Sequence, residues 1–246
     1  MEKNRWQNGC APSIVASAWC ARARDAGFDG VELWANHYLL ADRSEQARLA
    51  DPALGVRVFN SYLPVGHAAP EETENLVRSV QELCPGVRGV KFNLGPPPAA
   101  LKTEMAAAAA LADALPSSVD LWCECHGDTV IETPEAARLA FMRWEYRFGA
   151  ILHPIGMPEE QMRAWFDATG GRIRHLHLQP RDANNRFIRM DRCAAAVAQA
   201  FASLRALGFA GSASIEFVEG SATGDENPER VFENAVADLA FLRREI

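Results

Sequence analysis

The feature that most constrains this chain of 246 residues is a regular alternation of two hydrophobic patterns. A short apolar run rich in β-branched or aromatic residues is followed by a polar turn and then by a stretch with helical spacing, and the pattern repeats to the C-terminus. This alternation predicts βαβ units and a parallel sheet. The predicted strands are residues 5–10, 30–35, 56–63, 87–95, 120–127, 148–154, 173–179 and 212–220.

The stretches between the predicted strands carry signals for helix starts. A proline followed by glutamate places a residue without a backbone N–H at the first helical position and an acidic side chain in the first turn. An alanine-rich stretch has a spacing of leucine and methionine that suits a helix with one buried stripe. The predicted helices begin at Pro70, Pro134, Pro158 and Pro228, with others over residues 12–26 and 102–115.

Eight strands alternating with helices close into a barrel or lie open as a doubly wound sheet. Gly27 and Gly30 flank a predicted strand, but no G-x-G-x-x-G turn opens a helix, as a dinucleotide-binding sheet would require. We therefore predict a single (β/α)8 TIM barrel over residues 1–246, since barrels of this length stay undivided. In such a barrel the chemistry lies at the carboxyl ends of the strands.

Composition narrows the partners. The formal net charge is −7, with no basic block, which argues against nucleic acid. No apolar run approaches the roughly 20 residues that span a bilayer, and the polar start lacks the plan of a secretory signal, so we expect a cytoplasmic protein without a membrane partner. The six cysteines form no paired C-x-x-C motifs and are expected to be reduced.

Several polar side chains share a face of a predicted strand, because side chains alternate along strands. Glu124 shares its face with His126, and His177 shares its face with His175. Glu216 stands between two apolar residues of the last strand. A carboxylate in an apolar strand needs a compensating partner, which for Glu124 could simply be a salt bridge to Lys91.

A metal ion is the alternative partner for these carboxylates. Glu124, His153, His177 and Glu216 fall near the ends of four consecutive predicted strands. Oxygen and imidazole ligands that converge in this way suit a divalent ion. We therefore predict one divalent metal ion, Mn²⁺, Zn²⁺, Co²⁺, Fe²⁺ or Mg²⁺, at this position.

The motifs resemble the sugar phosphate isomerase and epimerase family of the xylose-isomerase-like TIM barrel superfamily. The resemblance covers the chain from about Ala26 to the C-terminus. The matching stretches are Gly27-Phe28-Asp29-Gly30-Val31-Glu32-Leu33, Glu124-Cys125-His126-Gly127 with Thr133-Pro134-Glu135, His175-Leu176-His177-Leu178 with Asp182, and Ser214-Ile215-Glu216-Phe217.

The resemblance implies metal ligands at Glu124, His153, His177 and Glu216, with the two glutamates also acting as the catalytic acid and base. His153 stands where the family usually has aspartate, which removes one negative charge and favours softer metals such as Zn²⁺, Mn²⁺ or Fe²⁺ over Mg²⁺. The resemblance also implies a function: a metal-dependent sugar isomerase or epimerase that transfers a proton through a metal-stabilised enediolate.

We expect substrate contacts from five further residues. They are Lys91, Asn93, His126, Glu32 and Arg181. The expected substrate is a carbohydrate or polyol, and Arg181 would suit a phosphate or carboxylate group. The resemblance also implies a homodimer or homotetramer.

Two other functions remain open, and a third is disfavoured. The same site chemistry serves dehydratases of inososes or dehydroshikimate. A barrel with a degenerate metal site at His153 would bind a sugar without turning it over. Abasic-site DNA repair is disfavoured, because Asn60 and Asn93 stand where imidazoles would be expected and the net charge is negative.

Overall fold

The computed structural model describes residues 14–84 and 86–245. Seven strands form one sheet in the order β1-β2-β3-β4-β5-β6-β7, and the pairs from β1 to β5 are parallel. The strands are β1 (Val31–Trp34), β2 (Val56–Pro64), β3 (Gly89–Asn93), β4 (Asp120–Glu124), β5 (Phe148–Leu152), β6 (Ile173–Leu178) and β7 (Ser212–Ile215). Seven of the eight predicted strands are therefore confirmed, and the prediction for residues 5–10 lies outside the described residues.

Helices separate the strands along the chain. They are α2 (Ala16–Asp25), α3 (Ala35–Leu39), α4 (Arg43–Leu49), α5 (Pro70–Leu83), α6 (Leu101–Ala114), α7 (Pro134–Phe141), α8 (Glu159–Thr169), α9 (Ala194–Ala206) and α10 (Pro228–Glu245), with 3-10 turns η1 (Pro52–Leu54) and η2 (Met190–Cys193). The predicted starts at Pro70, Pro134 and Pro228 are confirmed, and α8 begins one residue after Pro158. Among the helices of the described chain, none is long and apolar enough to cross a membrane.

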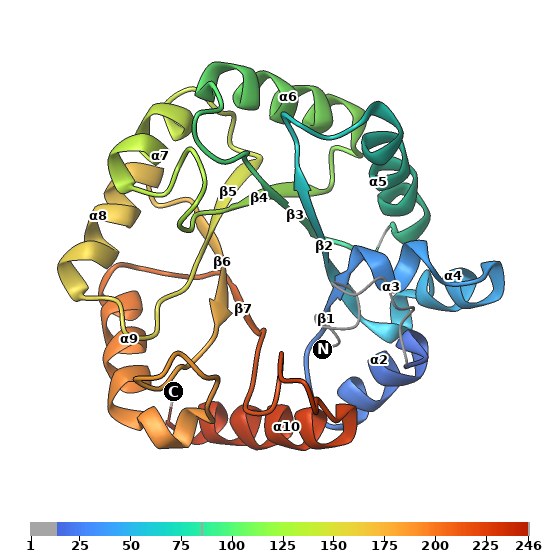
Figure 1. Cartoon of the computed structure of the whole chain (residues 1–246), viewed down its shortest axis with the longest axis vertical. Helices are drawn as coiled ribbons and strands as arrows, with labels where there is room; N and C mark the ends of the chain where they lie inside the picture. The colour runs from blue at the N-terminus through green and yellow to red at the C-terminus, as the bar shows by residue number, and fades with distance from the viewer. Residues whose placement is uncertain (1–13, 85, 246) are drawn as a thin grey trace. The chain divides into compact units, whose positions relative to one another are not determined.

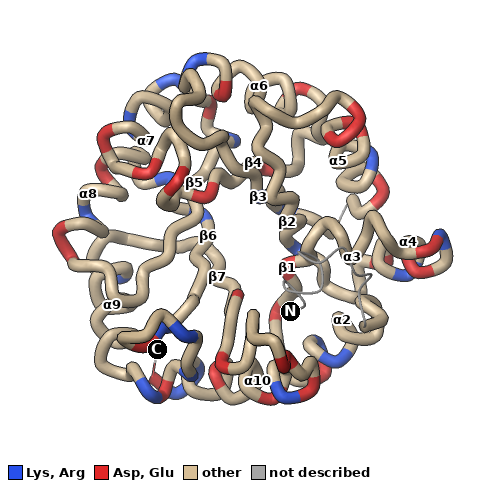
Figure 2. Tube along the Cα trace, in the orientation of Figure 1, with Lys and Arg blue, Asp and Glu red and all other residues tan. Residues whose placement is uncertain are grey.

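The described residues divide into two compact units. The larger unit is Val15–Leu152 with Ala164–His175, and the smaller unit contains Ile14, His153–Arg163 and residues 176–245. The larger unit holds β1 to β5, with α5, α6 and α7 flanking the strands (Figure 1). Lys and Arg are interspersed with Asp and Glu along these helices (Figure 2). The expectation of one undivided domain stays a prediction.

The core of the larger unit is built from strands that are buried on both faces. Every residue of β3 and of β5 is buried, as expected for parallel strands covered by helices. Trp122 on β4 lies between two glycines of the neighbouring strands: a Cβ at Gly89 would lie 2.6 Å from its ring, and a Cβ at Gly149 would lie 3.1 Å from it. These glycines therefore make room for the indole, which stacks on His175 with the ring centroids 5.3 Å apart.

In the smaller unit, α10 contributes a buried carboxyl group. Asp238 is 1% exposed, and its Oδ1 accepts a hydrogen bond from the backbone N–H of Met190 at 2.8 Å. Its Oδ2 has no hydrogen-bond partner among the described residues. The pKa of Asp238 is raised to about 6, mainly by burial. The Met190 hydrogen bond and Arg189 oppose this rise, and Asp191 and Glu219 add to it.

We expect the free energy of unfolding of an Asp238→Asn variant to increase relative to that of the wild type as the pH rises. The raised pKa means that the folded protein disfavours the ionised carboxyl, so the wild type loses stability from about pH 4 until the pH passes the folded value near 6. Asparagine has no charge to bury. Its free energy of unfolding relative to wild type should increase by about 2 kcal/mol between pH 4.5 and pH 7.5 in urea titrations. An equal difference at both pH values would contradict a raised pKa.

Candidate active site

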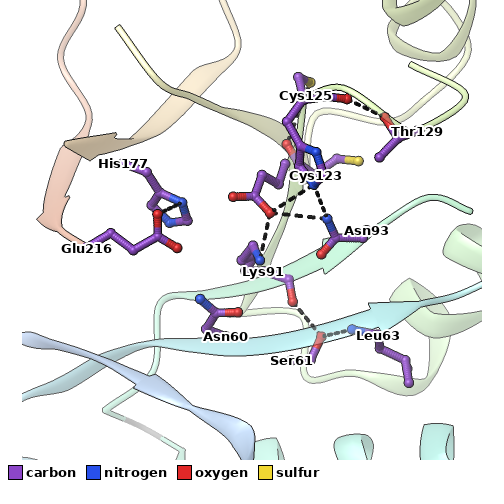
Figure 3. Close-up of polar contacts among 12 residues, drawn as sticks. Asn60, Ser61, Leu63, Lys91, Asn93, Cys123, Cys125, Thr129, His177 and Glu216 are labelled. Carbon is purple, nitrogen blue, oxygen red and sulfur yellow. Dashed lines mark hydrogen bonds and ion pairs between the residues drawn. The ribbon is translucent and has the colours of Figure 1, made fainter. Parts of the chain in front are cut away.

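Three potential metal ligands gather in the smaller unit. His153 follows β5 directly, His177 lies on β6, and Glu216 follows β7 directly. The His177 Nδ1 atom lies 3.2 Å from Oε2 of Glu216 (Figure 3). The rings of His153 and His177 meet edge to face, with their centroids 5.3 Å apart. Each of the three offers a ligand atom within 4.8 Å of the others. This group has the donor chemistry to hold a divalent ion.

Burial distinguishes this group from an ordinary surface ion pair. The His177 side chain is 0% exposed, and the Glu216 side chain is 9% exposed. Gln179, one residue beyond β6, donates a hydrogen bond from Nε2 to Oε2 of Glu216. The Glu216 carboxylate is thus oriented by two side chains that follow each other at period two along the chain.

Arg181, which we expected to contact the substrate, pairs mainly with residues of its own loop. It lies in the turn after β6, where its guanidinium donates to the backbone oxygen and to Oδ1 of Asn185 at 3.1 Å each. It also packs 4.0 Å from the ring centroid of Phe187 and lies 3.4 Å from Oε1 of Gln179. A role in substrate binding stays a prediction.

In the larger unit, Glu124 ends β4 at the centre of a polar network. Lys91 Nζ lies 2.7 Å from Oε2 of Glu124, with side chains 0% and 5% exposed. Asn93 Nδ2 donates to the same Oε2 at 3.1 Å, and His126 Nε2 lies 3.4 Å from it (Figure 3). The salt bridge to Lys91 that we considered for Glu124 is therefore present, and Asn93 adds a hydrogen bond to the same carboxylate oxygen.

Glu32 on β1 is part of a second buried network in the larger unit. It accepts a hydrogen bond from Asn60 Nδ2 at 2.6 Å, and its Oε2 lies 3.2 Å from His175 Nε2. Glu32 therefore binds two polar side chains, one of them from a strand 143 residues away in sequence.

Sequence reasoning did not identify four residues of these networks as functional: Asn60, Tyr62, His175 and Gln179. Two of them had a usable signal, because His175 and Gln179 share a strand face with His177. Tyr62 has a positive φ of 50° and places its ring centroid 3.2 Å from Lys91 Nζ. Nothing in the sequence alone indicates that contact.

The five cysteines that the structure describes contribute no hydrogen bond or ion pair to these networks. Cys123 and Cys125 are buried, and burial is the main cause that raises the pKa of both thiols well above the usual range. A thiol that resists ionisation is a poor metal ligand. All five cysteines of the described residues are free, and Cys10 lies outside that part of the chain.

Three solved structures are similar to this chain over most of its length. The 3-keto-D-glucoside 4-epimerase YcjR from E. coli has a TM-score of 0.65 and 16% identity over 95% of each chain. The D-allulose 3-epimerase from Methylomonas sp. has a TM-score of 0.66 and 16% identity over 96% of this chain and 94% of that one.

A third similar structure was solved with a metal ion. A xylose isomerase-like TIM barrel protein from Mycobacterium smegmatis, in complex with magnesium, has a TM-score of 0.59 and 15% identity over 93% of this chain and 90% of that one. No protein-family model and no curated protein sequence matches the chain. The similarities show that the chain has a TIM-barrel fold, which confirms the predicted fold class.

Proposed function

We propose that this protein is a metal-dependent sugar isomerase or epimerase. The observation that carries the proposal is the group of His153, His177 and Glu216, of which His177 is buried and the other two are half-buried. It places two imidazoles and a carboxylate at the ends of consecutive strands of a TIM barrel. Two solved structures with the same fold are sugar epimerases, and this supports the choice of substrate class.

The fourth ligand that we propose is Glu124, from the end of β4. Each of the four consecutive strands β4 to β7 would then supply one ligand from its carboxyl end, as the sequence motifs imply. The contacts from Lys91 and Asn93 both reach Oε2 of Glu124, so a bond from its Oε1 to a metal ion would leave them in place. The mixed glutamate and histidine donors suit Mn²⁺, Zn²⁺, Co²⁺ or Fe²⁺, and we place Mg²⁺ behind them.

Side chains of the protein would carry out the proton transfer. We assign Glu216 and Glu124 as the acid and base pair: one, as a carboxylate, removes a proton from the carbon beside the substrate carbonyl, and the other, as a carboxylic acid, gives its own proton to the neighbouring carbon or to the opposite face. Gln179 and His177 hold Glu216 in place, and Lys91 and Asn93 hold Glu124. A bound divalent ion would supply charge to stabilise the enediolate.

One contact favours a second function, a barrel that binds a sugar without turning it over. The ammonium of Lys91 already compensates the buried charge of Glu124 at 2.7 Å, so this carboxylate has a partner with no metal bound. A site that had lost its metal would keep this arrangement.

Metal analysis of the purified protein separates the two functions. We expect about one equivalent of Mn, Zn, Co or Fe in the wild type. Glu216→Gln should bind the metal at least tenfold more weakly, because the variant loses one of the proposed ligands. The matched control is Glu219→Gln, whose carboxylate pairs with Arg192 at 3.0 Å and lies outside the proposed ligand set. Absence of metal from the wild type after incubation with each ion would favour the binding-only barrel.

A further inference from the structure

Two buried amide groups in the larger unit have carbonyl oxygens without a partner. Asn60 on β2 is 5% exposed and Asn93 on β3 is 8% exposed. The Oδ1 atoms of both have no hydrogen-bond partner among the described residues. A buried acceptor that is left unpaired costs about 1–3 kcal/mol, so its presence calls for an explanation.

The orientation of both amides is fixed by their partners. Asn60 Nδ2 lies 2.6 Å from Oε1 of Glu32, and Asn93 Nδ2 lies 3.1 Å from Oε2 of Glu124. An ionised carboxylate only accepts hydrogen bonds, so in each case the amide nitrogen must face it. The oxygens that remain unpaired are therefore acceptors, and a flip of either amide would break a charge-assisted bond.

A histidine confirms the orientation of Asn93. His126 Nδ1 lies 2.5 Å from the carbonyl oxygen of Gly127, which can only accept, so Nδ1 carries a hydrogen; in the Nδ1–H tautomer, Nε2 is the acceptor. Asn93 Nδ2 lies 3.0 Å from that Nε2 and donates its second hydrogen to it. Both hydrogens of the Asn93 amide are thus used, and only Oδ1 is left for a ligand.

The two amides belong to one face of the sheet. Asn60 is the register partner of Lys91 on the neighbouring strand, and Asn93 follows Lys91 by two residues, which returns it to the same face. Figure 3 shows Asn60, Lys91 and Asn93 together on β2 and β3. The chain therefore presents two acceptors beside one lysine.

The charge of this face opposes an anionic ligand. Lys91 contributes one positive charge, which Glu124 neutralises at 2.7 Å, and Glu32 adds a second carboxylate. A phosphate or carboxylate placed against Asn60 and Asn93 would meet two acceptors and no net positive charge, so it would lose its water without gaining donors.

We infer that Asn60 and Asn93 form a subsite that accepts hydrogen bonds from two hydroxyl groups of a neutral polyol. The inference rests on the proposed function and narrows its substrate class to an unphosphorylated sugar or polyol at this face. Each hydroxyl hydrogen satisfies one orphaned carbonyl oxygen. A hydroxyl group can also accept a hydrogen bond, so a polyol hydroxyl could accept one from the Lys91 ammonium as well.

The first test changes the ligand and leaves the protein intact. Thermal shifts of the full chain are measured with D-fructose, D-allulose, D-sorbitol and myo-inositol, and with D-fructose 6-phosphate and myo-inositol 1-phosphate. We expect at least one neutral compound to raise the melting temperature, as mass action requires of a ligand of the folded state, and its phosphorylated form to do so less. The inference fails if no neutral compound stabilises the protein or if the phosphorylated forms stabilise it more.

The second test removes single donated hydrogens. Calorimetry compares the best neutral compound with analogues in which one hydroxyl at a time is replaced by fluorine, which cannot donate. Two positions should each weaken binding about tenfold or more, because the analogue leaves a buried carbonyl unpaired. Equal affinity for every fluorinated analogue would overturn the inference.

A variant pair checks the location. Asn93→Leu should abolish the ligand-induced shift relative to its own melting temperature, whereas Asn75→Leu on α5 should keep it. An unchanged shift in Asn93→Leu would place the polyol elsewhere. All measurements are repeated with EDTA and with Mn²⁺, and metal content is assayed separately. Polyol binding by a protein that takes up no Mn²⁺ would contradict the proposed function while the subsite stands, and Mn²⁺ binding without polyol binding would do the reverse.

Discussion

Glu216→Gln is expected to slow sugar interconversion by about 10²- to 10⁴-fold, the usual contribution of a positioned acid or base. The amide keeps the size of the side chain but cannot take up a proton, and it is a weaker metal ligand than a carboxylate. The measurement is the rate of isomer formation from a ketose that the wild type converts, followed by chromatography at saturating metal.

The control for this variant is Glu219→Gln. Its carboxylate lies close in sequence but pairs with Arg192, so the rate should stay near that of the wild type. Circular dichroism and melting temperature show whether both variants are folded. A folded Glu216→Gln protein with the wild-type rate would remove Glu216 from the acid and base pair.

Lys91→Met is expected to destabilise the metal-free protein by about 3 kcal/mol or more, because it leaves the buried Glu124 carboxylate without its cation. Both side chains of the pair are almost fully buried, so solvent cannot replace the lost ammonium. Urea unfolding in EDTA measures the change in the free energy of unfolding.

The matched double variant Lys91→Met, Glu124→Gln should recover most of this loss, since the uncharged amide needs no cation. Saturating Mn²⁺ should also recover part of it if Glu124 binds the metal. A single variant as stable as the wild type would show that the ion pair does not compensate a buried charge. No recovery with metal would argue against Glu124 as a ligand.

The strands were predictable because each is a short apolar run bounded by turns. β3 and β5 are buried along their whole length, and they read as continuous apolar segments in the sequence. The short helices α3 and α4 were not predicted, since five to seven residues hold too little of the helical period to be recognised. The start of α4 did carry a signal: Asp42 accepts a hydrogen bond from Glu45 N at 2.8 Å.

Within the site, contacts along one strand or between consecutive strands were easier to predict than contacts between distant strands. The pairing of Lys91 with Glu124 follows from polar residues on neighbouring apolar strands. The contact between Glu32 and His175 joins residues far apart in sequence, and a single sequence does not give the register that brings them together. Motif resemblance supplied the candidate ligands, but it gave no sign that Gln179 orients Glu216.

The most direct test of the central claim is solvent deuterium exchange into a sugar. The metal-free protein is incubated in D₂O with each ketose, with and without added Mn²⁺, Zn²⁺, Co²⁺ or Fe²⁺, and the sugars are examined by proton NMR. We predict metal-dependent loss of the signal from the carbon next to the carbonyl, absent in Glu216→Gln. No exchange with any metal and any sugar, from a protein that binds both, would contradict proton transfer and favour a barrel that only binds its ligand.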